Sequence, residues 1–278
     1  MSRIGFVKAH ACGNDFLIIE ESLANGRHAS MARKLCSRNT GIGADGIEFL
    51  DRKKDSRAAD GSAGTYFLRL FNADGSEAEL SGNGTRCVAA WLAASEGLQQ
   101  VSFGTHGGIR TCRLIRRDDV EYWIESGMGI PRVMPCSIEI SGVDHPIAGA
   151  MVNVGNPHFV LFTDHEDFSA HGLCWTALGA KISVDPLFPF GTNVEFVRVL
   201  SATEIAFRIY ERGCGPTTSS GTGTCAASAA AIVLRDAARE LAAAAQGGTQ
   251  QVVWPTNDSE MLLTGPAEII CTGEVDFA

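Results

Sequence analysis

The sequence lacks the features that mark several common classes of protein. No apolar run approaches the roughly 20 residues that a membrane-spanning helix needs. Lys8 and His10 interrupt the N-terminal segment, where a signal peptide would carry its apolar stretch. The nine cysteines form no Cys-x-x-Cys pair and no spacing typical of a zinc site. These absences predict a cytoplasmic protein with reduced thiols, no membrane contact and no metal.

Positively charged residues are also few. The 278 residues include 23 Lys and Arg against 32 Asp and Glu, which gives a formal net charge of −9 at pH 7. Because a negative protein repels a phosphate backbone, we expect no nucleic-acid partner. Hydrophobic residues make up 45% and charged residues 20% of the chain, so it can form a packed core. The length suggests roughly two domains.

Short apolar runs between turn residues predict a strand-rich α+β protein. The runs with the length and composition of strands are residues 16–19, 66–71, 159–162, 194–197 and 205–210. Residues 99–116 predict a hairpin around Gly107-Gly108. Three segments predict helices, namely 30–37, 85–96 and the alanine-rich 224–246, which Gly247-Gly248 would end.

One segment occurs twice. Residues 81–87 read Ser-Gly-Asn-Gly-Thr-Arg-Cys and residues 220–225 read Ser-Gly-Thr-Gly-Thr-Cys, 139 residues further on, which is half the length of the chain. Each follows a polar loop after a predicted strand and opens a predicted helix. The repeat predicts two related halves, each with one Ser-Gly-x-Gly turn, and a site between them. Chance similarity between glycine-rich segments is the alternative.

The chemistry of these turns suggests a ligand. The start of a helix carries unpaired N–H groups and a partial positive charge, and glycine lets a ligand approach the backbone closely. Two such turns aimed at one point would hold a carboxylate and stabilise charge that develops on it. This suits an α-amino acid, whose α-carbanion delocalises into its carboxylate. Helix capping by Ser81 and Ser220 is the alternative, and it is compatible with ligand binding.

Two further residues are candidates for the same site. Arg212 lies in a glycine-rich loop after a predicted strand, where a guanidinium can bind a carboxylate through two hydrogen bonds; a surface salt bridge is the alternative. His158 is a candidate base or orienting group, with a structural role as the alternative. Residues 41–46 match Gly-x-Gly-x-x-Gly, but a predicted helix precedes them and a predicted strand follows, which is the reverse of a dinucleotide site.

The sequence resembles the diaminopimelate epimerase family of pyridoxal-independent amino-acid racemases and epimerases, almost from end to end. The blocks that carry the resemblance are residues 8–16, 41–46, 71–76, 82–87, 155–158, 193–194, 211–213, 221–223 and 263–267. The resemblance implies two pseudo-symmetric α/β halves, each a curved, mostly antiparallel sheet or barrel around a central helix, with the active site in the cleft between them. We place the N-terminal half at 1–119, with strand 266–278 returning to it, and the C-terminal half at 120–265.

The resemblance also implies an activity. Members of the family convert LL- to meso-diaminopimelate, a precursor of lysine and peptidoglycan, by proton transfer between two cysteines on opposite faces of the α-carbon. The matching positions here are Ser81 and Ser220, which His158 and Glu211 would support. The substrate-binding residues implied by the resemblance are Asn14, Asn72, Gly82, Asn83, Asn156, Asn193, Arg212, Gly221 and Thr222. It implies a small-molecule amino-acid substrate, no metal or organic cofactor, and a homodimer.

The two serines depart from the family pattern and leave the chemistry open. A thiol has a reference pKa of about 8.5, which a helix start lowers, whereas a serine hydroxyl is far harder to ionise. The chain is therefore an epimerase weakened or inactivated by serine at both positions, a divergent lyase or isomerase of the same fold, or a non-catalytic amino-acid-binding relative. Pro216 is a further departure, because the family usually has glutamate there, and it bears on the identity of the substrate.

Overall fold

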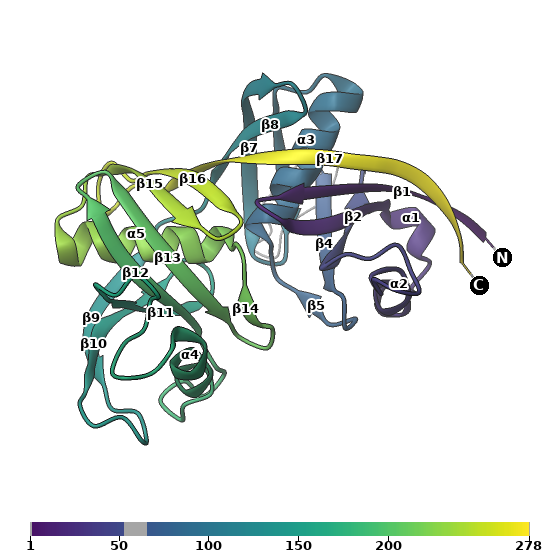
Figure 1. Ribbon diagram of the computed structural model, residues 1–278. Helices are drawn as coiled ribbons and strands as arrows, with labels where there is room; N and C mark the ends of the chain where they lie inside the picture. The colour runs from purple at the N-terminus through teal and green to yellow at the C-terminus, as the bar shows by residue number, and fades with distance from the viewer. Residues whose placement is uncertain (1, 53–65, 278) are drawn as a thin grey trace. The chain divides into compact units, whose positions relative to one another are not determined.

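The computed structural model describes residues 2–52 and 66–277. The chain forms two compact units (Figure 1). The first unit comprises Met1–Gly127 and Thr264–Ala278, and the second comprises Met128–Leu263. The first boundary lies eight residues beyond the predicted one at 119/120, because strand β8 (Glu121–Gly127) pairs with β7 (Gly108–Asp118) and so stays in the first unit.

The first unit is a closed barrel around a helix. Its remaining strands are β1 (Ser2–Ala11), β2 (Asn14–Glu20), β3 (Gly46–Asp51), β4 (Tyr66–Asn72), β5 (Glu77–Ala78), β6 (Gln100–Thr105) and β17 (Leu262–Phe277). Pairing runs β1–β2–β3–β4–β6–β7–β8–β17 and returns to β1. Figure 1 shows β17, in yellow, alongside β1. Helix α3 (Gly82–Glu96) contacts β1, β2, β3, β6, β7 and β8, so it is the central helix.

The second unit repeats the order of strand pairs around a central helix. Its strands are β9 (Arg132–Ile138), β10 (Ile147–Asn153), β11 (Pro157–Phe162), β12 (Asn193–Ser201), β13 (Glu204–Glu211), β14 (Gly215–Thr217), β15 (Glu240–Ala245) and β16 (Gly248–Val253). The strand order β10–β11–β12–β13–β15–β16 alternates antiparallel and parallel pairs as β1–β2–β3–β4–β6–β7 does. Helix α5 (Gly221–Arg235) contacts seven of these strands and is the central helix of this unit.

The predicted pseudo-symmetry of the two halves is confirmed. Helices α3 and α5 are each 15 residues long and begin 139 residues apart. Each is surrounded by apolar side chains of its own unit, with small residues such as Ala90 and Ala229 fully buried on the helix. A small side chain lets a central helix lie close to the strands around it. The alanine-rich composition of the two segments therefore serves the packing of the barrel interior.

Three short helices lie outside the barrel interiors. They are α1 (Glu21–Ala24), α2 (His28–Leu35) and α4 (Trp175–Ser183). Helix α2 follows β2 as α4 follows β11, so both units place a helix in the same parallel connection. The sequence patterns predict α2 and α3 to within three residues but predict neither α1 nor α4. No helix in residues 2–52 or 66–277 has the length and hydropathy to span a membrane.

The predicted helix over 224–246 is wrong in its second half. Helix α5 ends at Arg235, where Asp236 adopts a left-handed conformation with φ of 53°. Residues 240–245 instead form β15, which pairs with β16 and β13. The helix propensity of alanine is worth at most about 1 kcal/mol per residue over residues other than proline, and pairing with two neighbouring strands outweighs it. The five predicted strand runs and the hairpin over 99–116 are confirmed.

Candidate active site in two equivalent halves

The repeated Ser-Gly-x-Gly turns cap the two central helices. Ser81 is the N-cap of α3, and its Oγ accepts a hydrogen bond from the N–H of Gly84 at 3.0 Å. Ser220 is the N-cap of α5, and its Oγ accepts from the N–H of Gly223 at 3.3 Å. Both hydroxyls therefore lie at the positive end of a helix dipole, beside first-turn N–H groups that the helix itself cannot satisfy.

In the first unit, Asn14 and Asn83 connect this helix start to a cluster of charges. Asn83 Nδ2 donates to Asn14 Oδ1 at 3.0 Å, and Asn14 Nδ2 donates to Asp45 Oδ2 at 2.7 Å. Arg38 then bridges Asp45 and Asp15, at 2.8 and 2.7 Å. Two predicted binding residues are therefore held in a fixed orientation by an ionic network that sequence reasoning did not identify.

Asp15 is the centre of that network. It is 6% exposed and receives two hydrogen bonds from Arg38, while Lys8 Nζ lies 3.2 Å from its Oδ2. Burial acts to raise the pKa of Asp15, but the hydrogen bonds and charges of Arg38 and Lys8 outweigh it, so the pKa is lowered from its usual value of 3.8. Lys8 Nζ also donates to the carbonyl of Gly43, in the loop over 41–46. That loop follows α2 and precedes β3, as predicted.

We expect Asp15→Asn to destabilise the first unit by about 2 kcal/mol at pH 7, because it leaves Lys8 and Arg38 without their shared carboxylate. The lowered pKa means that Asp15 stabilises the folded state above pH 3.8 and that this stabilisation is lost as pH falls below it. Urea unfolding at pH 7 and pH 3 measures both effects. Asp118→Asn, which loses an exposed ion pair with Arg116, is the matched control. Equal destabilisation in the two variants would contradict the prediction.

In the second unit, a chain of hydrogen bonds leads from a buried carboxyl to Ser220. Glu195 Oε1 lies 2.6 Å from His158 Nδ1, and His158 Nε2 lies 2.9 Å from Asn156 Oδ1. Asn156 Nδ2 donates to Thr222 Oγ1 at 3.4 Å, and Thr222 Oγ1 lies 3.4 Å from Ser220 Oγ. Asn156 is thus linked to the start of α5 as Asn14 is linked to the start of α3. His158 is not an isolated structural histidine.

Three other predicted residues lie at the end of β13 and the start of β12. Asn193 Oδ1 accepts from the backbone N–H of Arg212 at 2.8 Å, and Arg212 Nη1 donates to the carbonyl of Phe190 at 3.0 Å. The Arg212 side chain is exposed and forms no ion pair with any described residue, so the surface salt bridge is not what this structure shows. Glu211 Oε1 accepts a short hydrogen bond from Thr217 Oγ1.

Asn72 is the remaining predicted binding residue. It ends β4, as Glu211 ends β13. Its Nδ2 donates to Ser76 Oγ at 3.0 Å, in the turn that leads to β5. Glycines 82 and 221 begin the two central helices, where they are buried. Within each unit, the structure thus places the predicted residues at the end of the barrel where its central helix starts.

Sequence reasoning missed two buried glutamates. Glu48 pairs with Leu70 on β4, and Glu195 pairs with Ile209 on β13. Leu70 and Ile209 are 139 residues apart, the spacing of the two central helices, so the two glutamates occupy equivalent positions. A Cβ added at Gly84 would overlap Glu48 Oε1, so this carboxyl packs directly against the first turn of α3. A single acidic residue within an apolar strand run, as in Ile-Glu-Phe-Leu and Val-Glu-Phe-Val, is the signal that could have identified both.

The two glutamates differ in their partners. Burial raises the pKa of Glu48 to about 8, and its Oε1 has no hydrogen-bond partner among the described residues. Burial also raises the pKa of Glu195, against the opposing charge and hydrogen bond of His158. The register of the parallel pairs explains the difference. Phe16 lies opposite Gly46 as His158 lies opposite Asn193, so phenylalanine occupies the histidine position in the first unit.

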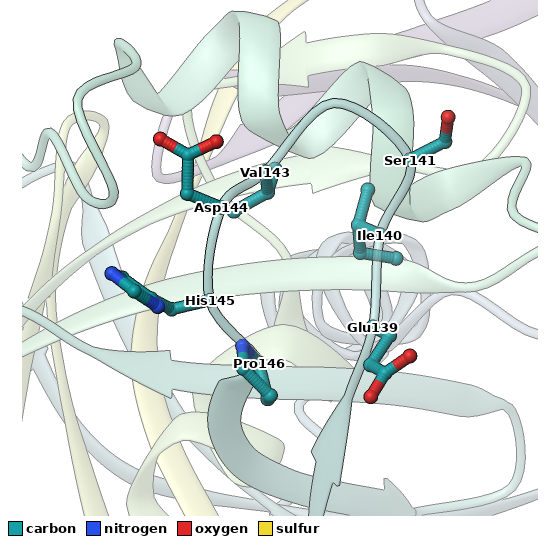
Figure 2. A pocket seen from close by; sticks show the side chains of 7 residues that line it. All are labelled: Glu139, Ile140, Ser141, Val143, Asp144, His145 and Pro146. Atoms are coloured by element: carbon teal, nitrogen blue, oxygen red, sulfur yellow. The ribbon is translucent and has the colours of Figure 1, made fainter.

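No metal cluster is associated with these residues in the part of the chain that the structure describes. In the described ranges, no three His, Cys, Asp or Glu side chains gather as metal ligands. A hollow of about 450 Å³ lies on the connection between β9 and β10 (Figure 2). Its lining residues, 139–141 and 143–146, include the carboxylates of Glu139 and Asp144 and the imidazole of His145, and none of the predicted site residues.

Comparison with known proteins identifies the family. The sequence pattern described as Diaminopimelate epimerase matches residues 6–134 and 150–270. The chain is 33% identical to the diaminopimelate epimerase of Synechocystis sp. over 289 residues, covering 99% of each protein. It is 36% identical to that of Desulforudis audaxviator over 287 residues, covering 97% of this chain and 98% of the relative.

Solved structures support the fold. A phenazine biosynthesis protein of the PhzF family from Bacillus anthracis superposes with a TM-score of 0.74 at 16% identity, covering all of both chains. A hydroxyproline epimerase from Agrobacterium vitis superposes with a TM-score of 0.72 at 14% identity, covering 98% of this chain and 92% of that one. Because the family pattern and the sequence identity of 33% and 36% to these relatives extend over almost the whole length, the chain belongs to the diaminopimelate epimerase family, a family of isomerases.

Proposed function

We propose that this protein transfers protons at the α-carbon of a free amino acid of the diaminopimelate class, without an organic or metal cofactor. The observation that carries the proposal is the pair of equivalent helix starts, each with a serine hydroxyl and first-turn N–H groups. Removing an α-proton places negative charge on the adjacent carboxylate. The N–H groups of Gly82, Asn83, Gly221 and Thr222 would stabilise that charge, as helix starts do for other anions.

The polar residues around the two helix starts support binding of an amino acid. We propose that Asn14, Asn72, Asn156, Asn193 and Arg212 hold its amino and carboxylate groups. The exposed Arg212 guanidinium, held by the carbonyl of Phe190 through one nitrogen, keeps its other donors for a carboxylate. That Ser81 and Ser220 face one α-carbon from opposite sides is part of the proposal.

The serines set the expected rate. In the proposed reaction one side chain removes the α-proton and the other delivers a proton to the opposite face, with His158 and Glu211 in support. Each pKa unit by which a hydroxyl is harder to ionise than a thiol adds about 1.4 kcal/mol. Proton transfer through Ser81 and Ser220 is therefore slow compared with a thiol pair. This same property favours the alternatives of an elimination or isomerisation that needs one strong base, or of binding without turnover.

Exchange of the α-proton with solvent tests the proposal. LL- and meso-diaminopimelate are incubated with the protein in D2O, and the α-proton is followed by NMR. We expect slow loss of the α-proton signal with inversion of configuration. Formation of an elimination product would favour the lyase alternative, and binding without exchange would favour the non-catalytic one.

Two variants make the exchange experiment specific. Ser220→Ala should abolish exchange with inversion, because it removes the hydroxyl that acts on one face of the α-carbon in the proposed reaction. Ser219→Ala removes the neighbouring hydroxyl, which accepts from Gln250 at 3.4 Å, and should retain exchange. Loss of exchange in both variants would mean that any substitution at 219–220 disrupts the site, and it would contradict a specific role of the Ser220 hydroxyl in proton transfer. The cytoplasmic location and the homodimer stay predictions.

A further inference from the structure

His158 and Glu195 form a pair that is closed to solvent. Both side chains are 0% exposed, and Nδ1 lies 2.6 Å from Oε1. The second carboxyl oxygen of Glu195, Oε2, is buried and has no hydrogen-bond partner among the described residues. Isolated burial of a carboxyl is unfavourable by several kcal/mol, so the contact with His158 is the interaction that offsets it.

The hydrogen bonds assign the protons of this pair. Asn156 Nδ2 donates to Thr222, which leaves Asn156 Oδ1 to face His158. Because Oδ1 can only accept, His158 Nε2 must carry a proton. A second proton then lies between Nδ1 and Oε1, either as imidazolium with carboxylate or as neutral imidazole with carboxylic acid. In both states Glu195 fixes the plane of the imidazole ring and keeps the proton on Nε2.

The surroundings of His158 contain few other groups that titrate. On β10 the apolar Val152 pairs with it, and on β12 Asn193 lies opposite. Helix α5 contributes Thr222 through Asn156, and the buried thiol of Cys225 belongs to the apolar cluster that includes Val152. Of the described residues, Glu195 is the charged group in direct contact with the imidazole.

We propose that Glu195 is a positioning residue. It holds His158 through Nδ1, and through the Nε2–H bond it fixes the amide of Asn156, and hence Thr222, at the start of α5. This inference rests on the proposed function for its effect on turnover, but the arrangement of protons can be tested without any substrate. The first unit offers a natural comparison, because Glu48 occupies the position equivalent to Glu195 while Phe16 occupies the position equivalent to His158.

The ring nitrogens of His158 report directly on the proposal. The protein labelled with ¹⁵N-histidine is examined by NMR, and the His158 signals are those missing from His158→Gln. In the unaltered protein we expect a proton on Nε2 and a strongly downfield hydrogen-bonded proton at Nδ1, slow to exchange with solvent. A bare Nδ1 with no such proton would overturn the proposal, even if every variant failed to fold.

Matched variants separate positioning from packing. Glu195→Gln should abolish the downfield Nδ1 proton and change both ring-nitrogen shifts, whereas Glu48→Gln makes the same substitution at the equivalent position and should leave them unaltered. Equal change in both variants, or none in Glu195→Gln, would overturn the proposal. In the exchange assay, Glu195→Gln should lower the rate on the order of 10²-fold, as expected for a misplaced site group. If the unaltered protein shows no exchange, the proposed function fails, while the NMR result still decides the role of Glu195.

Discussion

The double variant Ser81→Cys/Ser220→Cys is expected to exchange the α-proton of diaminopimelate on the order of 10³-fold faster than the unaltered protein. A thiol has a reference pKa of about 8.5, and the N-terminal end of a helix lowers it further. A difference of at least about three pKa units from a hydroxyl corresponds to roughly 4 kcal/mol, or three powers of ten in rate. The fold already places both side chains at helix starts.

The substitution is conservative for the fold. Each serine accepts one hydrogen bond from a backbone N–H, and a weaker sulfur acceptor is expected to destabilise the helix by only about 1 kcal/mol. Solvent exchange measured by NMR gives the rate. Ser219→Cys is the matched control, because it adds a thiol next to Ser220 but outside the N-cap. If the double variant is no faster than Ser219→Cys, serine is not what limits proton transfer, and the two-base proposal is wrong.

The buried carboxyl of Glu48 is expected to make the stability of the first unit fall steeply with pH. Its usual pKa is 4.5, and burial raises it to about 8 in the folded protein. Between these values the folded state keeps a proton that the unfolded state has lost. The free energy of unfolding therefore falls by about 1.4 kcal/mol per pH unit, or roughly 5 kcal/mol in total by the time pH exceeds 8. Below pH 4.5 this contribution is fully present.

Glu48→Gln removes the titrating group and should flatten this dependence. The protein is equilibrated in urea at a series of pH values from 5 to 9. A short pulse of hydrogen exchange at one fixed pH then measures the fraction of molecules in which α3 is unfolded. Peptides from α5 give an internal comparison in the second unit. Glu274→Gln, which alters a carboxylate 61% exposed on β17, is the matched control and should retain the dependence. Equal pH dependence in Glu48→Gln and the unaltered protein would contradict the prediction.

Local patterns in the sequence predicted most of the strands and the two central helices. Apolar runs of strand length fall within β2, β4, β11, β12 and β13. Capping by Ser81 and Ser220, which the sequence offered as an alternative interpretation of the Ser-Gly-x-Gly repeat, is present at both helix starts, because a serine there accepts a first-turn N–H. The failure over 240–245 has a physical cause. Alanine is small enough for either a helix or a crowded strand, so its fate depends on neighbours that are distant in the sequence.

The candidate site likewise combines residues that the sequence predicted with contacts that only the structure shows. Asn14, Asn83, Asn156 and Thr222 were predicted from the family resemblance, but the ionic network of Arg38 with the buried Asp15 was not. Asp15, Arg38 and Asp45 are spread over 30 positions and form no periodic sequence pattern. Only the pairing of β2 with β3 places Asp15 beside the loop that carries the other two. Contacts between residues remote in sequence depend on strand register, which the sequence does not display.

By itself, the sequence determined the family, the two related halves and the serine hydroxyls at the helix starts, since each depends on residues adjacent in the chain. Only the tertiary structure decided that Glu48 and Glu195 occupy equivalent buried positions, and that Glu195 contacts a histidine while Glu48 Oε1 has no hydrogen-bond partner among the described residues. The reason is the register of the parallel strand pairs, which places His158 and Phe16 at matching positions. Whether a buried carboxyl has a partner is decided by that neighbouring strand.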